Sequence, residues 1–378
     1  MTFSEISSFS PTNVMIKEMA KPATATQNSK FLSRHLQLLP SAYESNDTAR
    51  LTLAFFIVEA MAIVGESVTE ESRRGYIDYI YSCQLTHSNG GGFRGSLSMG
   101  KQRYDQNEIP TYDPSNLTMT YTAILLLGLL RDDFTRLDMA GVLQSIRDRR
   151  HPDGSFSPTP TNSESDIRLV YCACAISTLI GDFSAIDVAS TLAYIHGCRT
   201  YDGSYSQIPN AEGQGGTTYC ALASLEMISK HLSQQNRQQE LLSQEDVHCT
   251  LRWLAQRQVD GFQGRTNKDS DTCYSFWIRG AFNSLKSLAN LPTDLHLFDD
   301  EQDGHFIISC AHALGGIAKY PDEFPDVLHN CLGLSALSMA QNRVEQAQSF
   351  SHINSTLNVD VSSLEHIHTC INTLKEPL

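Results

Sequence analysis

A short helix-like segment that ends in a Gly-rich turn recurs along this chain and constrains its fold more than any other feature. Each turn carries one aromatic or apolar residue, and these residues are Phe93, Phe156, Tyr205, Phe262 and Ile317. Their spacing of roughly fifty to sixty residues is about the length of two helices and their loops. Self-similarity at a fixed period is typical of repeat architectures, so we interpret each turn as a unit boundary.

A more apolar segment of helical length follows each turn. The segments are TMTYTAILLLGLL, IRLVYCACAISTLI, TTYCALASLEMI, TCYSFWIRGAFNSL and LHNCLGLSALSMA, and RLTLAFFIVEAMAIV precedes the first turn as a sixth candidate. Helices that are apolar on nearly all faces are buried, whereas the amphipathic segments between them should lie outside. Strand-type alternation is weak throughout. The pattern predicts an all-α fold, an α-α toroid of six inner and six outer helices, with an open helical solenoid as the alternative.

Length, composition and net charge limit the domain organisation and the partners that this chain can have. The chain has 378 residues, of which 41% are hydrophobic, and can therefore bury a large core. We expect the toroid to span residues 45–340, with residues 1–44 and 341–378 as N-terminal and C-terminal extensions. Within them, residues 1 to about 30 and the final thirty are expected to be poorly ordered or peripheral. The formal net charge of −14 argues against a nucleic-acid partner, because phosphate neutralisation needs basic clusters.

Cysteine usage and hydropathy favour a cytoplasmic location. The ten cysteines are scattered, mostly through apolar stretches, without the paired spacing of secreted domains. The N-terminus lacks the apolar core of a signal peptide, and the run AILLLGLL is too short to span a bilayer. We therefore expect reduced thiols and no transmembrane segment.

The stretch GRTNKDSDTCYSFW, residues 264–277, combines residue types that bind metals and phosphates. Asp271 and Cys273 stand at the start of one predicted inner helix, and His329 heads the last one. Together they would give three protein ligands and leave a fourth position open, the arrangement of a catalytic zinc site. An N-capping Asp beside a buried Cys, together with a structural His, is the alternative that needs no metal.

The residues next to Asp271 and Cys273 favour a catalytic site over a purely structural one. Arg265 and Lys268 precede the helix in a loop, where a guanidinium fork and an ammonium can share one diphosphate. Tyr274 adds a hydroxyl donor, and Trp277 lies one helical turn beyond Cys273 on the same face. A solvated charged loop is the simpler interpretation of the two cations, but it does not explain why they adjoin an apolar helix.

From about residue 45 to 340 the chain resembles the β subunits of protein prenyltransferases. The resemblance is carried by GFQGRTNK, DTCYSFW, GGTTYCALASL and KYPDEFPDVLH. It implies the α-α toroid fold, one zinc ion held by Asp271, Cys273 and His329, and a lipid diphosphate held by Arg265, Lys268 and Tyr274. Gln214 stands where the family usually has a His that reaches the diphosphate, and its amide can donate a hydrogen bond without carrying charge.

The resemblance also implies a reaction and partners. A peptide cysteine thiolate would attack the allylic carbon of a prenyl diphosphate, in a heterodimer with a helical-repeat α subunit. Three subtypes share the motifs, and Thr52 falls where the farnesyl enzyme carries a bulky Trp, which leaves room for a fourth isoprene unit. We therefore expect a type I geranylgeranyltransferase β subunit acting on CaaX proteins such as small GTPases, with X usually Leu or Phe. A farnesyltransferase β subunit is the alternative.

Further residues follow from the same resemblance. Cys220 and Trp277 would join Thr52 in the lipid pocket, and Arg168 is the candidate for binding the CaaX carboxylate. Lys319 stands where the farnesyl enzyme has an Asp that helps bind magnesium, so a fixed ammonium would replace that ion and Mg²⁺ would not be required.

Two other classes are less favoured. A terpene cyclase shares the toroid, but the chain has no D-x-D-D acid motif. A non-catalytic helical scaffold would explain the repeats and not the joint presence of metal-type and diphosphate-type residues.

Overall fold

Two concentric rings of helices make up the protein. The structure is a computed structural model that describes residues 25–97, 112–161, 163–237, 239–341 and 343–375. Within these residues, the inner ring consists of α3 (Arg50–Ile63), α5 (Leu117–Leu129), α7 (Ile167–Ile180), α9 (Gly215–Gln234), α11 (Thr272–Leu288) and α13 (Val327–Met339). The outer ring consists of α2 (Ala25–Gln37), α4 (Glu70–Ser82), α6 (Met139–Arg147), α8 (Val188–Gly197), α10 (Gln244–Ala255) and α12 (Asp300–Ser309).

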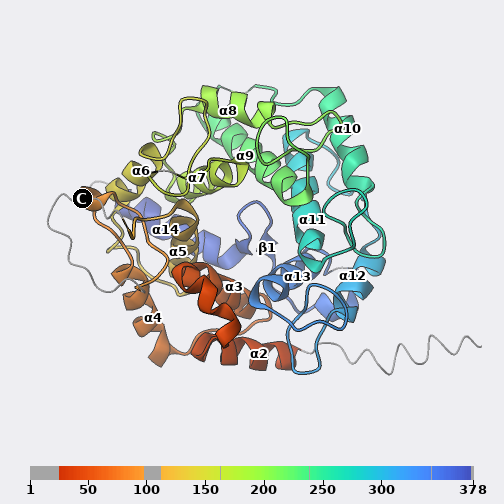
Figure 1. The fold of residues 1–378 in the computed structure, drawn as a ribbon, viewed down its shortest axis with the longest axis horizontal. Coiled ribbons are helices and arrows are strands. Elements are labelled where there is room, and N and C mark those ends of the chain that lie inside the picture. Colours follow the sequence, from red (N-terminus) through yellow and green to blue (C-terminus); the bar gives the residue numbers. More distant parts are fainter. Residues whose placement is uncertain (1–24, 98–111, 162, 238, 342, 376–378) are drawn as a thin grey trace, which may run out of the picture.

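The inner ring is closed. Each inner helix packs against the next one along the chain, and α13 packs back against α3 (Figure 1). Helix α5 shows why these segments lie inside, because eleven of its residues are buried, among them Ile124, Leu125 and Leu126. The predicted all-α toroid is therefore confirmed, and the open solenoid is excluded.

The glycines of the turns set how closely successive repeats approach. Gly154 has φ +90°, and a Cβ atom there would lie 2.1 Å from the carbonyl oxygen of Ser190, in the outer helix of the next repeat. Gly315 has φ +90°, and its Cβ would lie 2.2 Å from the carbonyl oxygen of Gln27 in α2. Only glycine allows both the left-handed backbone and this contact. The contact at Gly315 joins the last turn to the first outer helix.

Side-chain caps define where the inner helices begin. In five of these helices the side chain of the N-cap residue accepts a hydrogen bond from the backbone N–H two residues further on. The caps are Asn116 for α5, Asp166 for α7, Gln214 for α9, Asp271 for α11 and Asp326 for α13. Because every repeat runs from outer helix to turn to inner helix, these helices begin at the same end of the ring. Their caps form a polar rim at that end.

Both predicted extensions contain packed elements, which corrects the expectation that they are peripheral. Phe31 and Leu32 of α2 are buried, and α2 supplies the outer helix that packs against inner helix α3. At the other terminus, Ile367 and Ile371 of α14 (Val361–Lys375) are buried, and α14 packs against α5 and α7. Residues 1–24 of the N-terminal extension lie outside the described residues.

Short elements complete the described chain. Three 3-10 helices, η1 (Ser41–Ala49), η2 (His87–Asn89) and η3 (Glu345–Ala347), lie in the connections. Strands β1 (Ile353–Asn354) and β2 (Val359–Asp360) pair antiparallel in a hairpin that lies at the centre of the ring in Figure 1.

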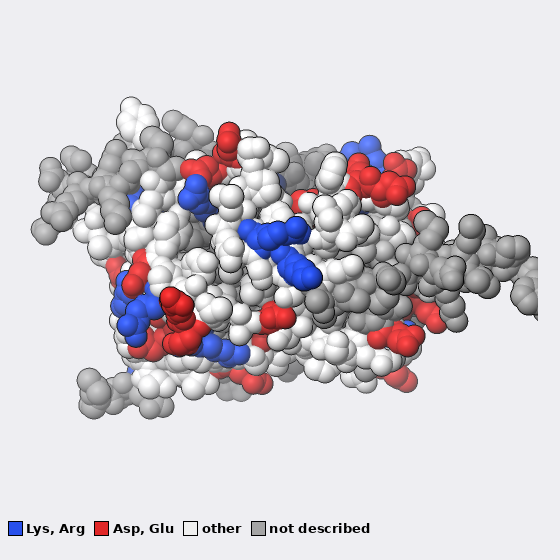
Figure 2. Space-filling model, turned by 90° about the horizontal axis from the view of Figure 1, so that it is seen from below, with Lys and Arg blue, Asp and Glu red and all other residues white. Residues whose placement is uncertain are grey.

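The thiols, the charged side chains of one face and the hydropathy of the helices can be described for these residues. All ten cysteines are free, and eight of them are buried. On the face drawn in Figure 2, basic side chains occur in small groups with acidic side chains near several of them. None of the described helices has the length and apolar character needed to cross a membrane.

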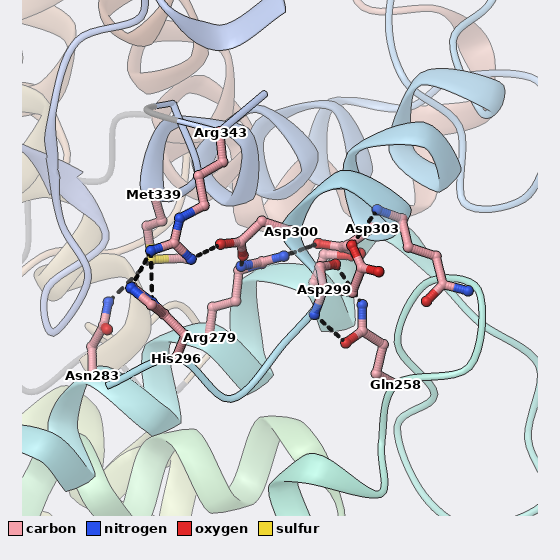
Figure 3. A network of polar contacts seen from close by, with 11 residues as sticks. Gln258, Arg279, Asn283, His296, Asp299, Asp300, Asp303, Met339 and Arg343 are labelled. Atoms are coloured by element: carbon pink, nitrogen blue, oxygen red, sulfur yellow. Dashed lines mark hydrogen bonds and ion pairs between the residues drawn. The ribbon is translucent and has the colours of Figure 1, made fainter. Parts of the chain in front are cut away.

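A buried ion-pair network ties α11, α12 and the end of α13 together. Arg279 of α11 lies between Asp300 and Asp303 of α12, and its guanidinium is 2.8 Å from the Asp303 carboxylate (Figure 3). Arg343, beyond α13, pairs with the other side of Asp300. The Arg279 side chain is 8% exposed and that of Asp303 only 1%. This network therefore holds α11, α12 and the end of α13 together in one part of the ring.

We predict that Arg279→Met strongly destabilises the protein. The substitution leaves the buried Asp303 carboxylate without a cation and Asp300 with Arg343 alone, and breaking a buried pair typically costs about 3–5 kcal/mol. Urea denaturation of the full chain measures the loss. Arg73→Met is the matched control, because Arg73 pairs with Glu70 at the surface and exposed pairs contribute about 0–1 kcal/mol. Equal losses in the two variants would contradict the structural role of the network.

Candidate metal and diphosphate site

The three predicted metal ligands lie together at the polar rim. Asp271 caps α11 and accepts the N–H of Cys273 at 2.9 Å, while His329 comes from the first turn of α13. The potential ligand atoms of these residues all lie within 4.8 Å of one another. His329 Nε2 is 3.4 Å from Asp271 Oδ1. One oxygen, one sulfur and one nitrogen donor at these distances can hold a metal ion with a further position open.

Asp326 orients the histidine of this cluster. Its Oδ2 lies 2.6 Å from His329 Nδ1, and its Oδ1 accepts the N–H groups of Leu328 and His329 at 2.9 Å each. A carboxylate on Nδ1 fixes the imidazole with Nε2 toward the other two ligands, as in many metal sites.

Burial and neighbouring charges shift the pKa values of His329 and Cys273 in the cluster. Burial lowers the pKa of His329, but hydrogen bonds and charges from Asp271 and Asp326 outweigh this and raise it to about 9. Burial, followed by the Asp271 charge, raises the pKa of the Cys273 thiol well above its usual value. A metal ion bound here would replace protons on the thiol and the imidazole.

Lys319 lies beside the cluster. Its ammonium is 3.8 Å from Asp271 Oδ2 and 4.9 Å from the centre of the Tyr320 ring. The backbone carbonyls of Ala318 and Lys319 accept hydrogen bonds from Thr272 at the start of α11. A fixed positive charge therefore stands next to the potential metal ligands.

The predicted diphosphate residues come from two adjoining turns. The N–H of Gly215 donates to the carbonyl of Gly264 at 2.8 Å, which joins the start of α9 to the loop before α11. A Cβ atom on Gly264 would lie 2.1 Å from the ring of Tyr274, so this glycine makes room for that side chain. Burial, together with the charges of Cys273 and Asp271, raises the pKa of Tyr274 to about 12, and its hydroxyl stays a donor at neutral pH.

The other three candidates of this group differ in their environment. Arg265 forms an ion pair with Glu212, and Lys268 is exposed on the loop. The side-chain oxygen of Gln214 accepts the N–H of Gly216 at 2.6 Å, so part of this amide serves as the cap of α9. Diphosphate binding by these residues stays a prediction.

The predicted lipid-pocket residues lie on three inner helices. The Trp277 ring is 5.0 Å from that of Tyr219, and neighbouring Cys220 is buried. Thr52 is the third residue of α3 and contacts Met119 and Thr122 of α5, each at 3.4 Å. It therefore lies toward the end of the ring where the inner helices begin.

Arg168, the candidate for the peptide carboxylate, is half exposed on the same rim. Its guanidinium binds the buried carboxylate of Asp166 at 2.6 Å and lies 3.8 Å from Glu164. A ligand carboxylate would have to share the guanidinium with these acids.

Sequence reasoning missed two acidic residues that contact the site. Asp326 could have been found from its place three residues before His329, the spacing of neighbours on a helix. Glu212, the partner of Arg265, lies in another repeat, and no local pattern in the sequence indicates that pair.

Comparisons with known proteins agree with this geometry. Residues 24–372 match the model of the prenyltransferase alpha-alpha toroid domain. The geranylgeranyl transferase type-1 subunit beta of Dictyostelium discoideum is 34% identical over 82% of this chain and 88% of its own length. For the protein of the same name from Arabidopsis thaliana the identity is 32%, over 86% of this chain and 90% of that protein.

A further relative and one solved structure of the same fold extend the comparison. The protein farnesyltransferase subunit beta of Schizosaccharomyces pombe is 31% identical over 90% of this chain and 84% of that protein. The structure of Candida albicans protein geranylgeranyltransferase-I complexed with GGPP matches with a TM-score of 0.76 at 24% identity, over 92% of this chain and 98% of that one.

This chain therefore belongs to the prenyltransferase α-α toroid family. Its predicted resemblance to the β subunits of type I geranylgeranyltransferases is confirmed by the relatives from D. discoideum and A. thaliana, and the enzyme class is that of the prenyltransferases.

We predict that Asp326→Asn weakens metal binding by about 10–100-fold, the usual effect of losing a carboxylate that orients a metal-ligating histidine. Asn retains the ability to cap α13. Chelator competition with zinc measures the affinity. Asp138→Asn is the matched control, because Asp138 caps the outer helix α6 away from the cluster. An affinity equal to wild type would show that Asp326 acts only as a cap.

Proposed function

We propose that this chain is the zinc-binding β subunit of a type I geranylgeranyltransferase, which transfers the lipid from geranylgeranyl diphosphate to the cysteine of CaaX proteins such as small GTPases. The observation that carries the proposal is the cluster of Asp271, Cys273 and His329 with Lys319 and the Arg265 loop at one rim of a closed toroid. A non-catalytic scaffold would not require this combination.

The donor set suits zinc. Carboxylate oxygen, thiolate sulfur and imidazole nitrogen are its common protein ligands, and three of them leave a position for substrate. Bound zinc supplies positive charge that favours the thiolate over the thiol of an incoming peptide cysteine near neutral pH. Asp326 holds the His329 imidazole with Nε2 facing the cluster.

The cations of the rim provide the remaining chemistry. As the bond between the allylic carbon and its oxygen breaks, negative charge grows on the departing diphosphate. Arg265, Lys268 and Lys319 would stabilise that charge, and the Tyr274 hydroxyl would donate a hydrogen bond. Binding of the diphosphate would compete with Glu212 for Arg265, since this guanidinium already forms an ion pair.

The preference for the longer lipid rests on Thr52 and on the two type-1 relatives. Threonine in place of a bulky aromatic residue leaves space for a fourth isoprene unit. A farnesyltransferase β subunit remains the alternative because of the S. pombe relative.

The proposed partners follow the family. An α subunit would complete the heterodimer, and the peptide carboxylate would bind near Arg168. A cytoplasmic location is proposed from the free cysteines.

The proposal is tested by co-expressing this chain with an α subunit and letting the two prenyl diphosphates compete for a Leu-ending and a Ser-ending CaaX peptide. We expect the wild type to prefer geranylgeranyl diphosphate and the Leu-ending peptide, and Thr52→Trp to shift the preference toward farnesyl diphosphate. Burial of one isoprene unit contributes roughly 3–4 kcal/mol at about 0.8 kcal/mol per methylene, so the shift could reach about a hundred-fold. A wild type that prefers farnesyl diphosphate would favour the alternative subtype.

A second prediction concerns Lys319 and magnesium. Because the ammonium already supplies positive charge beside Asp271, the wild type should reach nearly full single-turnover rate without magnesium. Lys319→Ala should be slow, and Lys319→Asp should regain rate when millimolar magnesium is added, since carboxylates are the ligands that this ion prefers. Lys375→Asp, at the end of α14, is the control for the change of charge. A strong magnesium requirement in the wild type would refute this role of Lys319.

A further inference from the structure

Two buried acidic side chains contain all the buried carboxylate oxygens that lack a hydrogen-bond partner among the described residues. These oxygens are both of those of Glu59, in α3, and Oδ2 of Asp360, at the end of β2. Glu59 is fully buried, Asp360 is 4% exposed, and β2 packs against α3. We call these two residues the acid pair. Because buried polar atoms are nearly always paired, the acid pair needs a hydrogen-bond donor or a counter-charge.

The other oxygen of Asp360 supports the start of α14. Oδ1 accepts the hydroxyl of Ser362 at 2.7 Å and the N–H of Ser363 at 3.0 Å, which is the role of a helix cap. Glu59, in contrast, accepts no hydrogen bond. One proton on Glu59 would satisfy both members of the acid pair, because a protonated carboxyl group donates and Oδ2 of Asp360 can accept.

The elements around Glu59 bring no positive charge to it. Besides Asp360 of β2, the titratable groups that act on it are Tyr121 of α5 and Cys331 of α13, and neither a phenol nor a thiol can be cationic. Burial raises the pKa of Glu59 well above its usual value, the charge of Asp360 raises it further, and the N–H of Asp360 opposes this only in part. An ionised Glu59 would thus be a buried charge without compensation.

The acid pair lies where α3 meets the C-terminal elements. Ser351, just before β1, donates its N–H to the carbonyl of Ile63 at 2.8 Å and its hydroxyl to that of Ala62 at 2.9 Å. The end of α3 therefore holds the segment that enters the hairpin. Glu59 lies about one helical turn earlier in α3, which packs against the strand that leaves the hairpin and leads directly into α14.

We propose that Glu59 is protonated in the folded protein and donates its proton to Oδ2 of Asp360, so that the acid pair is a pH-sensitive link between α3 and the start of α14. With the proton in place, the two acids share one hydrogen bond and a single negative charge. Without it, two buried carboxylates repel each other across this contact. The link belongs to the fold and operates whether or not the rim transfers a prenyl group.

The direction of the pH dependence follows from the raised pKa of Glu59. In the unfolded chain this group loses its proton near its usual pKa of 4.5, whereas the folded protein retains the proton to a higher pH. The contribution of the link to stability is therefore complete below the usual pKa and is lost as the pH rises to the folded pKa. Within this window the unfolding constant rises by about tenfold for each pH unit.

Urea unfolding of the full chain at several pH values, from about pH 5 to about pH 8, tests whether Glu59 holds a proton. Glu59→Gln retains the shape of the side chain, and its amide can donate to Asp360 at every pH. The ratio of the wild-type unfolding constant to that of Glu59→Gln should rise by about tenfold per pH unit, because the other groups are common to both proteins. A ratio that does not change with pH overturns the proposal.

Glu71→Gln is the matched control for the loss of one carboxyl group. Glu71 lies in the first turn of the outer helix α4 and is exposed. The pH dependence of this variant should follow that of the wild type. A rise of the same size in the ratio for Glu71→Gln would overturn the assignment of the proton to Glu59.

A second variant tests the partner of the proton. Asp360→Asn can still cap α14, and it removes the negative charge beside Glu59 while offering an amide donor. The loss of stability with pH should therefore end at a lower pH than in the wild type. A pH dependence equal to that of the wild type overturns the sharing of the proton with Asp360. If Glu59→Gln does not fold, this comparison alone decides the proposal.

Hydrogen exchange of residues 359–375 tests the link to α14. After correction for the intrinsic effect of pH on exchange, the rates in this segment should rise with pH in the wild type and stay constant in Glu59→Gln. Rates that respond to pH in the same way in both proteins overturn the link, even where the unfolding experiment shows a proton on Glu59.

Discussion

The close approach between the glycine of each turn and the outer helix of the next repeat is the contact on which this structure depends. At Gly154 and Gly315 the backbone comes so near the following outer helix that no side chain fits between them. The contact at Gly315 is made with α2, and it turns a row of helix pairs into a ring. Closure brings α13 against α3 and arranges all described inner helices around one centre. Without closure, α13 and α3 would be the two ends of a solenoid.

Closure also explains where the polar chemistry collects. Five of the six described inner helices have a side-chain cap, and these caps gather at one rim because all repeats run in the same direction. Asp271 caps α11 and is a potential metal ligand, while Asp326 caps α13 and holds the imidazole of His329. Asp271 is therefore the N-cap of α11 beside a buried cysteine, as the simpler interpretation predicts. Capping uses one carboxylate interaction and does not prevent Asp271 from also binding a metal ion. The fold supplies the acidic groups, and the site adds Cys273, His329 and Lys319 to them.

The C-terminal hairpin brings backbone carbonyls among the buried side chains of the inner helices. Hydroxyls of the inner helices bind the carbonyls of that hairpin, which would otherwise be buried without donors. A segment near the C-terminal end of the described residues thus packs at the centre of the ring (Figure 1). The same principle acts at the outer edge, where Arg279 neutralises the buried carboxylates of α12 and so supports the helices that carry the potential metal ligands.

The sequence by itself determined the features that are encoded locally. The period of the turns, the apolar character of the inner helices and the grouping of Asp271, Cys273 and the neighbouring cations all lie within short stretches, so pattern reasoning found the toroid and the centre of the candidate site. The tertiary structure decided what depends on distant partners. Such contacts join residues up to 289 positions apart. They include the packing of α2 on the last turn, the packing of α14, the pair of Arg265 with Glu212 and the hydrogen bond from Tyr121 to Leu357. A periodic pattern cannot indicate such contacts, because their geometry exists only after the ring has closed.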